Sequence, residues 1–184
     1  MRTAIEGEKM HAYPGMVAVV TSRLQERRNV MAAGWHAYIG ASPGMYGIAL
    51  REETFTYGLV KESGLFGVNF LPAAQSEAIQ GAGTYGGHEG DKLARLGLGY
   101  EDGLRTGVPV LCDAYMAYEC RVVDINSYGD HYWIVGEIVQ VYQDEALFGP
   151  DGLPDLAQLS IPLYMGRSAY RILDDTADKK IHRL

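Results

Sequence analysis

The sequence predicts a mainly β protein, a β-barrel with short appended helices. Short β-branched and aromatic runs recur along the chain and are separated by turn-forming residues, with 23 glycines in 184 residues. Runs of this kind are typical of strands joined by tight turns. Long helices at the spacing of βαβ units are missing from the pattern, so a doubly wound parallel sheet is not expected.

The strands are predicted where apolar runs end at turn residues. They are expected at residues 17–22, 31–39, 45–50, 65–71, 114–126 and 132–142, with two short final strands at 160–165 and 169–173. Residues 40–44 and 128–131 contain the glycines that turn the chain between neighbouring strands. Neighbouring strands are therefore expected to pair in antiparallel fashion. The polar residues 1–13 are expected to be extended or irregular.

Three short helices are predicted between the strands. They are expected at residues 54–63, 73–80 and 91–96. The first has Thr54 or Thr56 as its N-cap and Gly64 as its stop, since glycine adopts the left-handed conformation that ends a helix. Irregular segments are expected at the glycine-rich residues 81–90, at 147–158 and in the charged tail, 174–184.

Length and composition indicate one domain, residues 1–184, in a reducing compartment. The chain has 16 Lys and Arg against 23 Asp and Glu. It therefore lacks the basic surplus that would neutralise nucleic-acid phosphates, and no nucleic-acid partner is expected. Cys112 and Cys120 form neither a disulfide framework nor a CxxC motif. Since the N-terminal residues also lack the apolar core of a signal peptide, a cytoplasmic location is expected.

Residues 29–50 contain no Asp, Glu, Lys or Arg. The turn at 40–44 divides this stretch into two arms that are too short to cross the ~30 Å of a bilayer core, so no membrane association is expected. A barrel of this size cannot bury both faces of such a hairpin. An apolar face left uncovered in this way usually marks an interface, and a homodimer is therefore predicted.

Two stretches of the sequence match catalytic motifs but lack the structural features that those motifs require. Residues 40–44 match G-x-S-x-G with Ser42 as the nucleophile, but Pro43 has no N–H to stabilise an oxyanion. Residues 81–86 match G-x-G-x-x-G, yet they follow a predicted helix rather than a strand. A hydrolase and a Rossmann-type site are therefore not expected. The five histidines show no metal-ligand spacing, so no metal site is predicted.

Nine short pieces in a fixed order carry a family resemblance. They are YPGMVAVVT at 13–21, NVMAAGW at 29–35, ASP at 41–43, FT at 55–56, GLFGVNFL at 64–71, GDKL at 90–93, GVPVL at 107–111, AYECRV at 117–122, and GDH at 129–131 with VGEIV at 135–139. No piece is specific alone, but their order resembles the flavin reductase-like family. The resemblance covers about residues 13–172 and implies an antiparallel, dimeric, FMN-binding split barrel.

The resemblance also implies an activity. Members hold FMN, or sometimes FAD, at a dimer interface, and many take hydride from NADH or NADPH as co-substrate. The expected function is that of an NAD(P)H:flavin oxidoreductase, which in some members supplies reduced flavin to a separate monooxygenase. The alternative is an FMN-binding electron-transfer module without nicotinamide activity of its own. Flavin reduction depends on the orientation of two rings, so the lack of an acid–base pair does not oppose it.

The family match assigns the flavin ring and ribityl chain to the segment at 29–35. Small side chains there would let strand backbone lie against a flat ring. The cofactor-binding residues implied are Asn29, Met31, Ala32, Ala33, Gly34 and Trp35. Trp35 would either stack on the ring or fill the core. Ser42, at the end of this arm, would either bond to a phosphate or ribityl oxygen or cap its turn.

The flavin phosphate is expected at Thr56, because the N-terminus of a helix attracts anions. Many members carry Arg or Lys two residues earlier, where this chain has Thr54. Arg51 or Lys92 is expected to supply the missing charge.

Two further pieces of the resemblance concern the flavin and its reductant. Asp91 and Lys92 match a family pair near the flavin, although they would also suit a capped helix start. His131 of the GDH piece is expected to act as the catalytic residue that contacts nicotinamide or flavin, or else to close its turn.

Overall fold

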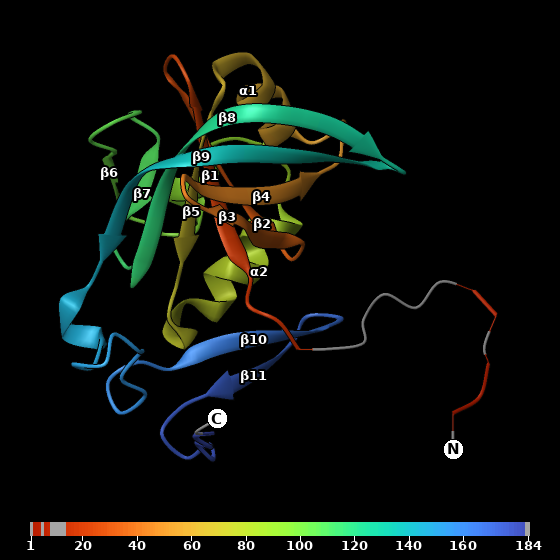
Figure 1. The fold of residues 1–184 in the computed structure, drawn as a ribbon. Coiled ribbons are helices and arrows are strands. Elements are labelled where there is room, and N and C mark those ends of the chain that lie inside the picture. The colour runs from red at the N-terminus through yellow and green to blue at the C-terminus, as the bar shows by residue number, and fades with distance from the viewer. Residues whose placement is uncertain (1, 5, 8–13, 183–184) are drawn as a thin grey trace.

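One strongly curved sheet of seven strands dominates the protein (Figure 1). The computed structural model describes residues 2–4, 6–7 and 14–182, so Tyr13, where the family resemblance begins, lies outside the described residues. The strands are β1 (Ala18–Leu24), β2 (Arg27–Ala33), β3 (His36–Ala41), β4 (Gly44–Leu50), β5 (Leu65–Phe70), β8 (Met116–Tyr128) and β9 (His131–Gln143). They lie in the order β2-β1-β5-β8-β9-β4-β3 with antiparallel pairing throughout. The predicted mainly β, antiparallel fold is confirmed.

The predicted single strand at 31–39 is wrong, because the chain leaves the sheet at Gly34 and Trp35. β2 pairs with β1 at one edge of the sheet, whereas β3 pairs with β4 at the other edge. The two bend residues connect these edges, and the Trp35 carbonyl accepts a 2.9 Å hydrogen bond from the Ala49 amide. The uncharged stretch at 29–50 therefore spans the opening between the first and last strands of the sheet.

The β8–β9 hairpin turns tightly, as predicted. Gly129 has a φ of 63°, a conformation that glycine adopts without a side-chain clash. Two short strands, β6 (Tyr100–Asp102) and β7 (Pro109–Leu111), were not predicted and form a separate pair. Their three-residue length explains why no periodic pattern indicates them.

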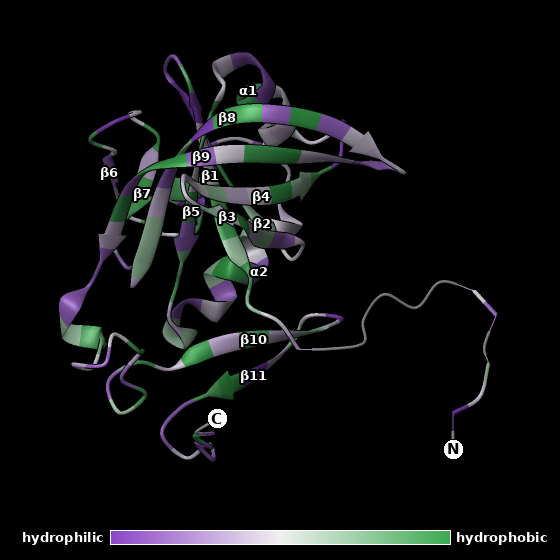
Figure 2. Cartoon of the chain, viewed as in Figure 1, coloured by the Kyte–Doolittle hydropathy of each residue, from purple (hydrophilic) through white to green (hydrophobic). Residues whose placement is uncertain are grey.

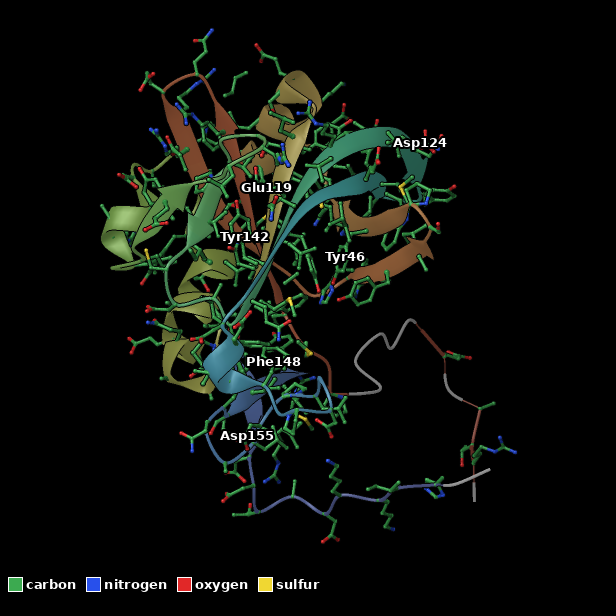
Figure 3. The ribbon with its side chains drawn as sticks, turned by 60° about the vertical axis from the view of Figure 1, so that its left-hand side comes forward. Tyr46, Glu119, Asp124, Tyr142, Phe148 and Asp155 are labelled. Carbon is green, nitrogen blue, oxygen red and sulfur yellow. The ribbon has the colours of Figure 1, made fainter. Side chains whose placement is uncertain are left out.

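A buried carboxylate ties the loop between β6 and β7 to the main sheet. Glu119 of β8 accepts hydrogen bonds from the Thr106 amide and hydroxyl and from the Tyr142 hydroxyl of β9 (Figure 3). Burial would raise the pKa of this carboxyl group, but the bonds from Thr106 and Tyr142 lower it instead. The charge is thus satisfied inside the fold and is not available for catalysis.

The first helix follows the local sequence rules. α1 (Phe55–Ser63) has Thr54 as its N-cap, and Gly64 ends it in the left-handed conformation. α2 (Ser76–Thr84) follows a 3₁₀ turn at Ala73–Gln75 and runs four residues into the predicted loop at 81–90. A side chain at Gly81 would lie 2.4 Å from a methyl carbon of Leu96, so close packing retains glycine within this helix. α3 (Lys92–Arg95) is capped by Asp91.

Hydrophobic residues form two clusters, one on each face of the sheet. The interior cluster includes Ile48, Phe66, Val68 and Ile134, whereas the other packs α2 and α3 against the outer face of β1 and β2. Alternating hydrophobic and hydrophilic bands along β8 in Figure 2 reflect this two-sided arrangement. The predicted final strands, β10 (Ile161–Gly166) and β11 (Ala169–Leu173), form a hairpin beside α2 (Figure 1). No helix in the described part of the chain is long and apolar enough to cross a membrane.

Candidate functional site

A cleft of about 320 Å³ opens where β2 leaves the sheet and β4 ends. We refer to it as the β2–β4 cleft. Eight of the residues predicted for the site line it: Met31, Ala32, Ala33, Gly34, Trp35, Arg51, Thr54 and His131. Ala49, Leu50 and Gly83 complete the lining. Residues from three distant parts of the sequence and one helix therefore meet in a single concavity.

The floor of the cleft is built from small residues. A side chain at Gly34 would meet no atom within 4 Å, so the backbone here faces open space. Gly83 of α2 lies against Ala32, since a Cβ at Gly83 would be 3.2 Å from the Ala32 methyl group. Backbone exposed in this way can contact a planar ring closely and offer it N–H groups.

One wall is formed by Trp35 and His131. Their ring centroids are 4.6 Å apart at an interplanar angle of 45°. His131 Nδ1 lies 2.7 Å from an Asp130 carboxylate oxygen, which as an acceptor requires the proton on Nδ1. This hydrogen bond from His131 lowers the pKa of Asp130. The imidazole orientation is therefore set by Asp130, and its Nε2 atom has no hydrogen-bond partner among the residues that the structure describes.

The anion-attracting end of the cleft adjoins the Trp35–His131 wall, because the Arg51 guanidinium lies 3.9 Å from the Asp130 carboxylate that holds His131. Thr54 donates to the Arg51 carbonyl at 2.8 Å and accepts from the Tyr57 amide at 3.3 Å, so its hydroxyl caps α1. The Arg51 guanidinium is half exposed and lies 2.9 Å from the Glu53 carboxylate. The positive end of the α1 dipole and the Arg51 charge thus lie together. Arg51 was one of the two cations predicted to complete the site.

Asn29 and Thr56 do not line the cleft. The Asn29 side-chain amide donates a 2.7 Å hydrogen bond to the Thr56 hydroxyl, and the two residues are 2% and 1% exposed. The sequence analysis placed both residues near the flavin. It could not show that β2 and α1 turn these two side chains toward each other. Ser42 also lies apart from the cleft, in the exposed turn between β3 and β4.

Asp91 and Lys92 serve the α2–α3 connection rather than the cleft. Asp91 accepts a 3.1 Å hydrogen bond from the Ala94 amide and so caps the start of α3. This is one of the two roles that the sequence analysis allowed for it. Lys92 is 4% exposed and donates a 2.7 Å hydrogen bond to the Ala82 carbonyl at the end of α2. Burial lowers the pKa of Lys92 to about 8, although Glu89 opposes the shift.

Sequence reasoning missed Gly83 and Asp130 as site residues. The glycine-rich segment that holds Gly83 was predicted as a loop able to lie over a ligand, but its helical conformation and its contact with Ala32 were not predicted. Asp130 was explained by the hairpin turn alone, although its place beside His131 in the sequence could have indicated the contact. Among the described residues, no group of three or more His, Cys, Asp or Glu side chains could hold a metal ion.

The curved antiparallel sheet has the architecture of a split barrel. The model of the flavin reductase like domain matches residues 10–174, so the chain belongs to this family. This is the family that the sequence resemblance predicted.

Two solved structures and one relative illustrate the similarity. An FMN-binding protein from Thermus thermophilus, solved with 1-cyclohex-2-enone bound, is 32% identical with a TM-score of 0.87, covering 98% of this chain and 100% of that one. Flavoredoxin of Desulfovibrio vulgaris is 28% identical with a TM-score of 0.85 over 97% of each chain. A ferric-chelate reductase (NAD(P)H) from Archaeoglobus fulgidus is 30% identical over 66% of this chain and 71% of its own.

Proposed function

We propose that this protein is an FMN-dependent reductase that uses NADH or NADPH as its electron donor. The observation that carries the proposal is the β2–β4 cleft, which combines a flat floor of small residues with an anion-attracting end. These are the two features that a ring joined to a phosphate requires. The names of three relatives support the donor: a ferric-chelate reductase (NAD(P)H), an FMN reductase (NADH) and an NADH-dependent flavin reductase.

The lining of the cleft supports one orientation of FMN. Arg51 and the start of α1 would hold the phosphate, and the backbone at Ala32, Ala33 and Gly34 would face the ring. When bound, FMN supplies hydride and electron transfer at its ring.

In this proposal, His131 contacts the electron donor. Its ring packs against Trp35 at the wall of the cleft, and Asp130 fixes its tautomer. His131 would position the nicotinamide of the donor over the exposed face of the ring site. Trp35 would limit the access of water from the same side.

The flavoredoxin similarity favours one alternative, an electron-transfer module that receives its electrons from a protein. Anaerobic addition of NADH, and separately of NADPH, to the FMN-loaded protein distinguishes the two functions. Rapid loss of the visible flavin absorbance supports the reductase. A flavin that stays oxidised with both donors but is reduced by dithionite supports the module. Failure to retain any FMN overturns both.

We also propose a homodimer. β3 is the last strand of the sheet, and it exposes Tyr38 and Ile39 beside the half-exposed Trp35. An exposed apolar edge strand without charges invites pairing with another chain, and a second copy would cover it. Trp35 also lines the β2–β4 cleft, so the partner would lie next to the flavin site.

The proposal extends to a consumer of reduced flavin and to a cellular location. A separate flavin-dependent monooxygenase is the proposed consumer, as the family resemblance implies. The cysteines are unpaired, Cys112 exposed and Cys120 buried, which suits the reducing cytoplasm. Coupled turnover with a purified monooxygenase that depends on FMN and NADH would test the partner.

A further inference from the structure

The loop between β6 and β7 holds an exposed leucine in a fixed position. Leu104 is 79% exposed, yet its amide donates a 2.9 Å hydrogen bond to the Tyr142 hydroxyl. The next two amides, of Arg105 and Thr106, donate to the buried Glu119 carboxylate at 3.1 and 2.6 Å (Figure 3). The buried charge of Glu119 therefore fixes a loop that carries an apolar side chain into the solvent.

Two arginines of the main sheet lie beside this loop. Arg23 of β1 and Arg28 of β2 are cross-strand partners, and their guanidinium groups lie 2.8 and 3.5 Å from the Asp102 carboxylate of β6. Arg23 also donates a 3.2 Å hydrogen bond to the Gly107 carbonyl. The guanidinium carbon of Arg28 lies 5.6 Å from the centroid of the Tyr100 ring. Both guanidinium groups are therefore held in place against the β6–β7 pair.

Two more arginines complete a basic surface around Leu104. Arg105 follows Leu104 in the loop, and the guanidinium of Arg121 on β8 donates a 3.3 Å hydrogen bond to the Arg105 carbonyl. Both arginines are exposed. We refer to six residues together as the arginine–leucine surface: Arg23, Arg28, Tyr100, Leu104, Arg105 and Arg121.

Positive charge exceeds negative charge on this surface. Among the residues that the structure describes, Asp102 is the one carboxylate in ion-pair contact with the four arginines, and none pairs with Arg105 or Arg121. Glu119 is buried, and its charge is satisfied by N–H groups of the loop itself. The whole chain has 16 Lys and Arg against 23 Asp and Glu, so a basic surface is an exception on it. The partner of this surface is therefore expected to be acidic.

The shape and the composition of the surface favour a protein partner. Leu104 projects into the solvent, whereas small-molecule sites are concave and enclose their ligands. Arginine and tyrosine are enriched among the residues that dominate the binding energy of protein interfaces. Guanidinium groups that are already held by a carboxylate or a carbonyl lose little freedom on binding. A nucleic acid suits the surface less well, because a chain with a net charge of −7 repels a polyanion.

We propose that the arginine–leucine surface docks an acidic protein, whose own face has carboxylates around an apolar depression. Leu104 would fill the depression, and the guanidinium groups would pair with the carboxylates around it. None of the six residues lines the β2–β4 cleft, so the inference goes beyond the proposed function and does not depend on it. Association is expected to weaken as salt screens the charges.

Peptides selected from a random library on the wild-type protein are the probe for the chemistry of the partner. We expect the selected peptides to carry several Asp or Glu residues and at least one large apolar residue. Fluorescence anisotropy then measures the Kd of one such peptide for the full chain. The Kd should rise about tenfold between ~0.01 and ~0.15 M salt, where the Debye length falls from ~30 to ~8 Å. Selected peptides without carboxylates, or a failure to select any peptide, overturn the proposal.

Two variants locate the binding of the selected peptide. Arg105→Glu reverses a charge that has no carboxylate partner among the described residues, and Leu104→Ser removes the apolar side chain. Each should raise the Kd about tenfold and leave the melting temperature unchanged. Arg171→Glu on β11 and Leu153→Ser in the loop before β10 are the matched controls, because each makes the same change at an exposed residue outside the surface. Equal effects of the variants and of their controls contradict the proposal.

Two other occupants are outcomes of the same test. If Leu104→Ser changes the mass of the protein in light scattering, the surface binds a second copy of the chain and the proposal is wrong. If the wild type binds phosphatidylserine vesicles and Arg105→Glu does not, the surface belongs to a membrane and the proposal is also wrong. Peptide binding is measured without flavin, so a protein that fails to retain FMN would remove the proposed reductase function and leave this test intact.

Discussion

The side-chain amide of Asn29 on β2 donates a 2.7 Å hydrogen bond to the hydroxyl of Thr56 in the first turn of α1. Both groups are almost fully buried. The bond joins the strand that forms the floor of the β2–β4 cleft to the helix whose N-terminus forms its anion-attracting end. It therefore sets the distance between the two parts of the site without facing the ligand itself.

Thr56→Val removes the acceptor of this bond and leaves the Asn29 amide buried without a partner. We expect the free energy of unfolding to fall by about 1–3 kcal/mol, the cost of an unsatisfied buried polar group. Urea unfolding measures the loss, and Thr56→Ser, which keeps the hydroxyl, is the control. FMN and riboflavin affinities should fall equally. A loss confined to FMN would show that the hydroxyl reaches the phosphate after all.

Arg51→Ala tests the proposed phosphate end of the cleft. We expect FMN to bind about tenfold more weakly, which corresponds to one lost hydrogen bond to a charged group. Riboflavin lacks the phosphate and should bind as before, and flavin fluorescence titration measures both. Glu53→Gln removes the carboxylate beside Arg51 and should leave FMN affinity equal or higher. Equal weakening of FMN and riboflavin by Arg51→Ala would contradict the assignment.

His131→Ala tests the proposed nicotinamide contact. The KM for NADH or NADPH should rise roughly fivefold, while the Kd for FMN changes less than about twofold, because the lost contact is worth about one hydrogen bond. Asp130→Asn should show a smaller effect of the same kind, since it weakens the 2.7 Å bond that orients the ring. A lower melting temperature with an unchanged KM would mean that His131 only closes the hairpin turn.

Ile39→Lys tests the proposed dimer. A charge in the middle of the exposed edge strand β3 should convert the dimer to a monomer, measured as mass by light scattering at micromolar concentration. Leu104→Lys is the matched control, because it places the same charge on an exposed leucine in the loop between β6 and β7 and should leave the mass unchanged. A wild-type protein that is monomeric with flavin bound would refute the dimer.

We expect the buried Lys92 to make the free energy of unfolding depend on pH. Burial lowers its pKa from 10.5 to about 8, so between these values the unfolded chain binds more protons than the folded one. The free energy of unfolding should therefore rise as the pH increases above about 8, and the whole shift corresponds to about 3 kcal/mol. Comparison with Lys92→Met by urea unfolding from pH 7 to about 9.5 isolates this contribution. Parallel curves for the two proteins would show that the lysine is not desolvated.

Local sequence was sufficient for several elements of the fold. Thr54 and Gly64 mark both ends of α1 because a capping hydroxyl and a left-handed glycine act within a few residues. Gly129 marks the β8–β9 turn for the same reason. The ordered series of short pieces also identified the family, and eight of the thirteen residues named for the site line one cleft.

Other features were decided only by the tertiary structure. The chain breaks between β2 and β3 because Gly34 and Trp35 pass from one sheet edge to the other, and strand periodicity carries no information about which edge a strand joins. Gly83 entered the site when α2 packed on Ala32. The direction of a buried side chain such as Thr56 depends on contacts between residues distant in sequence, which no local pattern encodes. The sequence by itself therefore determined the family and the strand of the cleft floor, whereas long-range packing determined which side chains face the ligand.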